Sequence, residues 1–163
     1  MDCKGKKIIV TGGSEGYGYG IAKKLKAEGA VVTITGRRPE LLKQAAAELG
    51  VNAVPSDVTS PADWDKLMAA VGEVDVLVNN AGAGIKIAPL ADYTDAEIDR
   101  SLAVNLAGVL YGCRRAAKIM TARRSGLIIN ISSVCAHYGW PGFVAYTAAK
   151  AGLDMASRAL YTE

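Results

Sequence analysis

Short, nearly continuous apolar runs alternate along this chain with amphipathic helical stretches, and this alternation restricts the possible folds more than any other feature. Five runs predict strands, at residues 8–10, 31–34, 51–54, 76–78 and 127–131. Continuous apolar runs are typical of strands that are covered on both faces. Strands that alternate with helices indicate parallel pairing and right-handed crossovers. We therefore predict an α/β fold in which a doubly wound parallel sheet has helices on both faces, with residues 1–163 as a single domain.

Helix start signals fall between the predicted strands. Ser60 stands in a capping position before one amphipathic stretch, and Thr94 and Glu97 have the spacing of a capping box. The capping box predicts a long helix that runs to about residue 122, and a last helix is expected from about residue 143. The inward face of the long helix is predicted to carry Ile98, Leu102, Leu106, Val109, Leu110, Cys113, Ala117 and Met120.

Composition excludes several classes of function. The chain has 163 residues, with 19 Lys and Arg, 16 Asp and Glu, one His and three Cys, and its net charge of +3 is too small to indicate nucleic-acid binding. Three Cys argue against a disulfide scaffold and for a reducing compartment, and one His with scattered Cys predicts no metal site. No apolar run approaches the roughly 20 residues of a membrane span. We expect a soluble cytoplasmic protein with no nucleic-acid or membrane partner.

A glycine-rich turn follows the first predicted strand, where open α/β sheets bind their ligands. Its spacing is G-x-x-x-G-x-G, and backbone amides at the start of a helix suit a pyrophosphate. The predicted cofactor-binding residues in this turn are Gly12, Ser14, Gly16, Tyr17 and Gly18. A glycine turn without a ligand is the alternative. Tyr17 and Tyr19 belong either to the core or to the pocket wall, and the core is the favoured interpretation.

Two arginines follow the second predicted strand. An NAD site would carry an acidic residue at this point, about 20 residues after the glycine turn, but Arg37 and Arg38 stand there instead. A guanidinium matches a 2′-phosphate in charge and geometry, so the predicted cofactor is NADP(H) rather than NAD(H). The alternative is a solvated basic turn. Glu15, within the glycine turn, is expected to repel that phosphate.

Small and amide residues follow the third and fourth predicted strands. Asp57 and Val58 come after the third, and Asn79, Ala81 and Gly82 come after the fourth. Such residues can lie beside an adenine or a ribose and satisfy its polar edges. Each is also a common turn former, so their shared position at the strand ends carries the prediction.

A candidate catalytic group lies in the second half of the chain. Tyr146 and Lys150 are four positions apart in the last predicted helix, which places them on one face. A nearby ammonium favours the phenolate and lowers a phenol pKa that is normally near 10. Ser133 is expected to end the fifth strand and to donate to a substrate oxygen, and Asn105 is expected to bind backbone or water beneath the site. Taken alone, the Tyr and Lys pair is more often a surface feature of a helix.

Together these motifs resemble the short-chain dehydrogenase/reductase family over almost the whole chain. The resemblance rests on the glycine turn, the Asn-Asn-Ala-Gly segment at residues 79–82, Asn105, Ser133 and Tyr146-x-x-x-Lys150, all in the family's order. It implies a Rossmann-like fold and hydride transfer between NADP(H) and a small-molecule carbonyl or secondary alcohol. Members of the family normally continue beyond the helix that carries Tyr and Lys, so the chain is expected to be truncated there.

The resemblance also implies a role for each member of the catalytic group. Tyr146 would be the general acid–base, Ser133 would polarise the substrate oxygen, Lys150 would bind the nicotinamide ribose, and Asn105 would anchor a water. A homodimer or homotetramer through the helices at residues 95–122 and 143–162 is expected. The alternatives are a non-catalytic dinucleotide-binding module or inactive fragment, and a sugar-nucleotide epimerase. His137 is expected either to touch substrate or to have a simple loop role.

Overall fold

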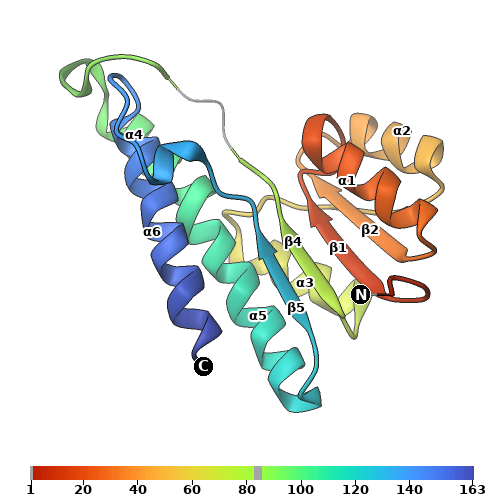
Figure 1. The fold of residues 1–163 in the computed structure, drawn as a ribbon. Coiled ribbons are helices and arrows are strands. Elements are labelled where there is room, and N and C mark those ends of the chain that lie inside the picture. The colour runs from red at the N-terminus through yellow and green to blue at the C-terminus, as the bar shows by residue number, and fades with distance from the viewer. Residues whose placement is uncertain (1, 83–85) are drawn as a thin grey trace.

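The computed structural model describes residues 2–82 and 86–163, and these form a parallel sheet with helices on both faces (Figure 1). The strand order is β3-β2-β1-β4-β5, with every neighbouring pair parallel. All five predicted strands are confirmed, with ends that differ by at most two residues. Their bounds are β1 (Lys7–Thr11), β2 (Val31–Gly36), β3 (Asn52–Pro55), β4 (Val76–Asn79) and β5 (Leu127–Asn130).

The helices begin and end close to the predicted signals. Ser60 caps its helix by accepting a hydrogen bond from the Asp63 amide, and Thr94 and Glu97 form the predicted capping box. The helices are α1 (Gly16–Ala27), α2 (Pro39–Leu49), α3 (Pro61–Val71), α4 (Asp95–Leu102), α5 (Gly108–Arg123) and α6 (Val144–Tyr161). Short 3-10 turns are η1 (Leu90–Asp92) and η3 (Val134–Ala136). Among the described residues, no helix is long and apolar enough to cross a bilayer.

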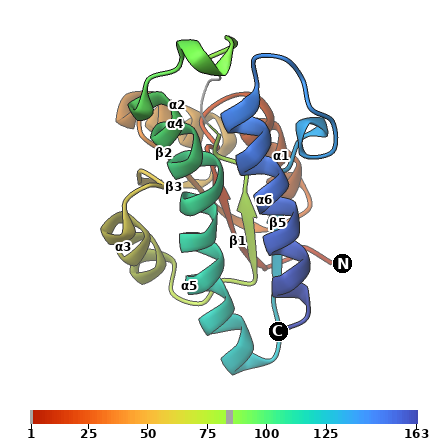
Figure 2. The same ribbon diagram turned by 90° about the vertical axis from the view of Figure 1, so that its left-hand side faces the viewer.

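Alternate residues of the central strands pack on opposite faces of the sheet. Ile8 and Val10 of β1 belong to a buried cluster with α1 and α2, whereas Ile9 packs with Trp64 of α3 and with residues of α5. All three β1 side chains are 0% exposed. Figures 1 and 2 show α1 and α2 on one side of the sheet, and α3, α5 and α6 on the other. The doubly wound prediction is therefore confirmed.

Two local predictions are wrong, and the long helix has one feature that was not predicted. β5 is not covered on both faces, because it lies at the sheet edge and Leu127 and Ile129 are each 40% exposed. Leu110 of the long helix is also 40% exposed instead of facing inward. The long helix itself contains a π-helical turn, η2 (Ala103–Ala107), between α4 and α5. The extra residue in that turn changes the phase of the helix, so one apolar stripe cannot be followed through it.

Candidate active site

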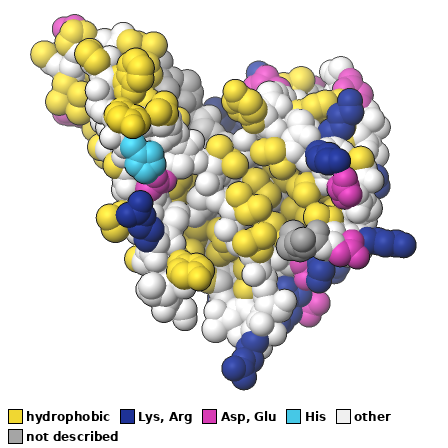
Figure 3. Space-filling model, in the orientation of Figure 1, with side chains coloured by type: hydrophobic (Ala, Val, Ile, Leu, Met, Phe, Trp, Pro, Cys, Tyr) yellow, Lys and Arg dark blue, Asp and Glu magenta, His cyan; other side chains and the backbone are white. Residues whose placement is uncertain are grey.

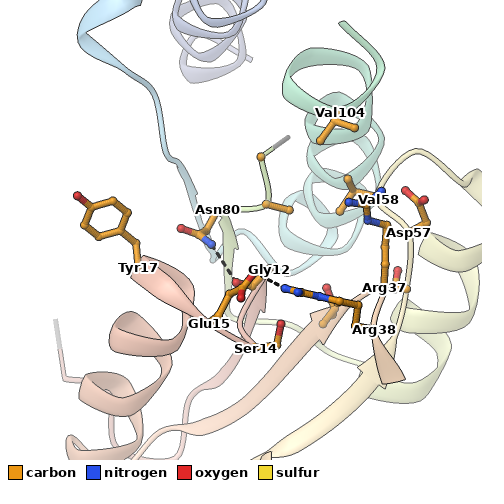
Figure 4. A pocket seen from close by; sticks show the side chains of 15 residues that line it. Gly12, Ser14, Glu15, Tyr17, Arg37, Arg38, Asp57, Val58, Asn80 and Val104 are labelled. Carbon is orange, nitrogen blue, oxygen red and sulfur yellow. Dashed lines mark hydrogen bonds and ion pairs between the residues drawn. The ribbon is translucent and has the colours of Figure 1, made fainter. Parts of the chain in front are cut away.

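A cleft of about 510 Å³ opens at the carboxyl ends of β1, β2, β3 and β4 (Figure 4). Parallel strands end at the same edge, so turns that are distant in sequence meet there. Nine of the predicted cofactor-binding residues line this cleft: Gly12, Ser14, Tyr17, Arg37, Arg38, Asp57, Val58, Ala81 and Gly82. The cleft is also lined by residues outside the predicted cofactor-binding set, namely Glu15, Thr35, Gly36, Ser56, Asn80 and Val104.

The Asn80 side chain, directly after β4, holds the glycine turn and the end of β4 together. Asn80 Nδ2 donates to the backbone oxygens of Thr11 and Gly12, at 3.0 and 3.2 Å. Gly12 has a φ of 65°, and a Cβ atom there would lie 3.0 Å from the Cα atom of Ala81. A side chain at this position would fill the floor of the cleft, so the glycine leaves backbone exposed to a ligand.

Five predicted cofactor-binding residues do not line the cleft; two of them, Tyr146 and Lys150, lie on α6 and are described below. Gly18 is buried in α1 and lets that helix approach the turn, since a Cβ atom there would lie 2.8 Å from the carbonyl carbon of Gly12. Gly16 provides a φ of 56° where α1 begins. Asn79 is 2% exposed, and its Nδ2 donates to Asn130 Oδ1 at 2.9 Å, so its side chain ties β4 to β5. Its neighbour Asn80 is the amide that lines the cleft.

The two tyrosines of the first helical turn have different environments. Tyr17 is 86% exposed at the cleft, so the interpretation of Tyr17 as a core residue is wrong. Tyr19 is partly buried against the cluster beneath α1, and its hydroxyl donates to Glu48 at 3.1 Å. The helix begins one residue before Tyr17, which turns this side chain away from the sheet.

The two arginines of the cleft, Arg37 and Arg38, have different neighbours. Arg38 Nη2 forms an ion pair with Glu15 Oε1, and both side chains are more than half exposed. Figure 4 shows Arg38 directed toward Glu15, while Arg37 extends toward Val58 and Asp57. The expectation that Glu15 repels an anion is thus modified, because an arginine already neutralises its charge.

Two residues that line the cleft carry a buried hydroxyl without a hydrogen-bond partner in the described part of the chain. The hydroxyl oxygens are Thr35 Oγ1, near the end of β2, and Ser56 Oγ, directly after β3. A buried polar atom without a partner is costly, so such atoms mark places where a ligand's polar groups fit. Their position at strand ends is the sequence signal that would have identified them. Together with the glycine turn, they fit a nucleotide cofactor.

Tyr146 and Lys150 lie together on α6. The Lys150 ammonium is 5.8 Å from the centroid of the Tyr146 ring, and Nζ donates to the backbone oxygen of Ile131 at 2.6 Å. Lys150 is 4% exposed. Burial lowers the pKa of this ammonium, and the Asp154 carboxylate partly opposes that effect. A buried cation is therefore held beside the phenol.

Ser133 and Asn105 belong to segments that pack against α6. Ser133 does not end β5, which stops at Asn130; it caps η3, where its Oγ accepts from the Cys135 amide at 3.2 Å. Asn105 is 1% exposed within the π-helical turn, and its Nδ2 donates to the backbone oxygen of Ser101 at 3.0 Å. That contact agrees with the prediction that Asn105 binds backbone. π-Helical turns are frequent at functional sites.

Comparison with known proteins decides the family. The model of the short chain dehydrogenase family matches residues 6–163. The chain belongs to this family. Nodulation protein G of Rhizobium sp. (strain N33) is 41% identical over all of this chain and 69% of its own length. The NADP-dependent (R)-specific alcohol dehydrogenase of Lentilactobacillus kefiri is 38% identical over 95% of this chain and 65% of its own length.

Solved structures of family members have the same fold. The closed form of a serine dehydrogenase complexed with NADP+ superposes with a TM-score of 0.92 at 30% identity, covering 96% of this chain and 65% of that one. A putative gluconate dehydrogenase from Agrobacterium tumefaciens gives a TM-score of 0.94 at 33% identity, covering 99% and 67%. The chain thus spans about two thirds of the length of these similar proteins.

Proposed function

We propose that the chain is part of an NADP(H)-dependent oxidoreductase that acts on a carbonyl or a secondary alcohol of a small molecule. The observation that carries the proposal is the buried Lys150 ammonium, which lies 5.8 Å from the centroid of the Tyr146 ring and donates to the Ile131 oxygen directly after the carboxyl end of β5. A cation at that distance stabilises the phenolate, which is the state that a catalytic tyrosine needs.

Each residue of the group has a role in this proposal. When bound, the cofactor supplies or accepts a hydride at its nicotinamide ring. In the reducing direction, Tyr146 gives its hydroxyl proton to the carbonyl oxygen, and Ser133 polarises that oxygen through its own hydroxyl. Lys150 binds the nicotinamide ribose and places a positive charge beside the phenol. Asn105 anchors a water that returns a proton toward Lys150.

The general acid–base role is tested by Tyr146→Phe. Removing one hydroxyl is expected to lower turnover by about 10²–10⁴-fold, because that is the range of general acid–base catalysis. The NADPH dissociation constant should be almost unchanged. Turnover equal to that of the parent protein in a carbonyl panel would refute the assignment.

The cofactor preference rests on Arg37, because Arg38 is already paired with Glu15. Arg37→Asp is expected to weaken NADPH more than NADH, since only NADPH carries a 2′-phosphate. Arg38→Ala is the matched control, and a smaller loss is expected from it. Fluorescence titration with both cofactors measures the difference, and equal losses in Arg37→Asp would exclude a phosphate contact.

A non-catalytic dinucleotide-binding module is the second candidate. It is favoured by the lining of the described cleft, which includes residues of the glycine turn but none of Asn105, Ser133, Tyr146 and Lys150. NADPH binding without oxidation by any carbonyl substrate would support it. Relatives include one named 3beta-hydroxysteroid dehydrogenase 1, from Eggerthella lenta, and an alcohol dehydrogenase, so a panel of steroid and simple ketones is the first to try.

We also propose that two or four copies associate through the helices at residues 95–122 and 143–162. Leu110 of α5 and Met155 of α6 support this, since they are 40% and 63% exposed. Sedimentation equilibrium measures the assembly, and a monomer at micromolar concentration would refute it.

A further inference from the structure

Three polar side chains form one stripe along α6. Tyr146, Lys150 and Asp154 follow one another at intervals of four residues, so each lies one helical turn beyond the last. The first two belong to the candidate active site. Asp154 has no place in that site and is partly buried, with 25% of its side chain exposed.

The Lys150 ammonium needs a compensating charge. It is 4% exposed, and the contact of Nζ with the Ile131 oxygen is made to a neutral group. A buried cation without an anion is strongly disfavoured, which is why burial lowers the pKa of Lys150. The Asp154 carboxylate acts in the opposite direction and favours the charged ammonium.

The same carboxylate reaches the segment that carries Ser133. Asp154 Oδ2 lies 3.2 Å from His137 Nε2. His137 ends η3, the short helix that Ser133 caps at its other end. Figure 3 shows the one histidine of the chain, in cyan, with an acidic side chain directly beside it. The Ser133 turn is thus attached to α6 one helical turn beyond Lys150.

We propose that Asp154 is a positioning residue: its carboxylate lies one helical turn from Lys150 as a counter-charge to the buried ammonium and, through His137, holds the Ser133 turn against the helix that carries Tyr146. One side chain thereby couples the two segments that supply the hydroxyls of the site. The inference rests on the proposed roles of those residues. The observations that carry it are the His137–Asp154 contact and the four-residue spacing on α6. In this inference His137 does not touch substrate but links the Ser133 turn to Asp154 on α6.

The first test follows the Lys150 side chain by NMR as the pH is raised, in protein labelled with [13Cε]lysine. Asp154→Asn keeps the size of the side chain and removes the charge, so the Lys150 titration midpoint should move to lower pH. Asp154→Glu should restore it, because the charge returns one methylene further out. Asp65→Asn is the matched control, since it removes a carboxylate that pairs with Arg115 on another helix. It should leave the Lys150 midpoint in place.

The second test measures amide hydrogen exchange in η3. Both Asp154→Asn and His137→Ala should speed exchange of the amides of Ala136 and His137, which donate within this turn. An unchanged Lys150 midpoint in Asp154→Asn, or unchanged exchange in both variants, would overturn the inference. Neither measurement uses cofactor or substrate, so this failure is distinct from a failure of the oxidoreductase proposal, which Tyr146→Phe tests through turnover.

Discussion

Gly18→Ala should both destabilise the fold and damage the cofactor cleft. Alanine in place of glycine within a helix normally stabilises by about 1 kcal/mol. At Gly18, however, the added Cβ would lie 2.5 Å from Asn80 Nδ2 and 2.8 Å from the carbonyl carbon of Gly12. The second neighbour is backbone and cannot rotate away. Forcing an extra carbon into a packed site costs about 1–3 kcal/mol, so the propensity gain should be cancelled or exceeded.

Gly20→Ala provides the matched control in the same helix. A Cβ atom at Gly20 would have no neighbour within 4 Å, so this variant should gain the full ~1 kcal/mol. For a chain of this length, 1 kcal/mol corresponds to about 2–4 °C in melting temperature. Gly20→Ala should therefore melt about 2–4 °C above the parent protein, and Gly18→Ala at or below it.

Calorimetry and NADPH titration together check this prediction. Gly18→Ala should bind NADPH more weakly, because α1 must move away from the glycine turn that lines the cleft, whereas Gly20→Ala should bind as the parent does. If both variants were stabilised equally with unchanged NADPH affinity, the close approach of α1 to Gly12 would contribute to neither stability nor cofactor binding, and the prediction would be wrong.

Two further predictions concern the core and the buried ammonium. Gly112→Ala should lower the free energy of unfolding by up to about 2 kcal/mol after the gain in helix propensity is subtracted, because its Cβ would lie 2.7 Å from Cζ2 of the fully buried Trp64. Urea denaturation followed by Trp emission measures the loss, and a stabilised variant would contradict the prediction. Lys150→Met should change the pH dependence of unfolding. Since burial lowers the pKa of Lys150 in the folded protein, the unfolded chain binds more protons between that pKa and 10.5, and wild-type stability should rise with pH there relative to Lys150→Met. Parallel stability curves for the two proteins would contradict the pKa direction.

The order of strands and helices could be predicted from the sequence because it depends on local information. Apolar runs such as residues 8–10 need two covered faces, and capping residues such as Ser60 and Thr94 satisfy amides only a few positions away. The π-helical turn around Asn105 could not be predicted in this way, because helix propensity does not distinguish it from a regular turn.

The candidate site was predicted in outline for a related reason. Strand ends of a parallel sheet converge on one edge, so the residues after each strand identify the cleft before any coordinates are known. Spacing also places Tyr146 and Lys150 on one face of α6, and their proximity is observed. Directions of side chains were less accessible, since Asn79 and Asn80 are neighbours with the same chemistry but point to different places.

The succession of elements, the edge of the sheet at which the cleft opens and the helix that carries the Tyr and Lys pair follow from period and spacing along one chain, so they could be predicted without coordinates. Only the tertiary structure decided which groups are partners across long separations. The pairing of Glu15 with Arg38, the burial of Thr35 and Ser56 at the cleft, and the contact of His137 with Asp154 each join different segments. Such pairings depend on how the elements pack in three dimensions, and no local pattern records them.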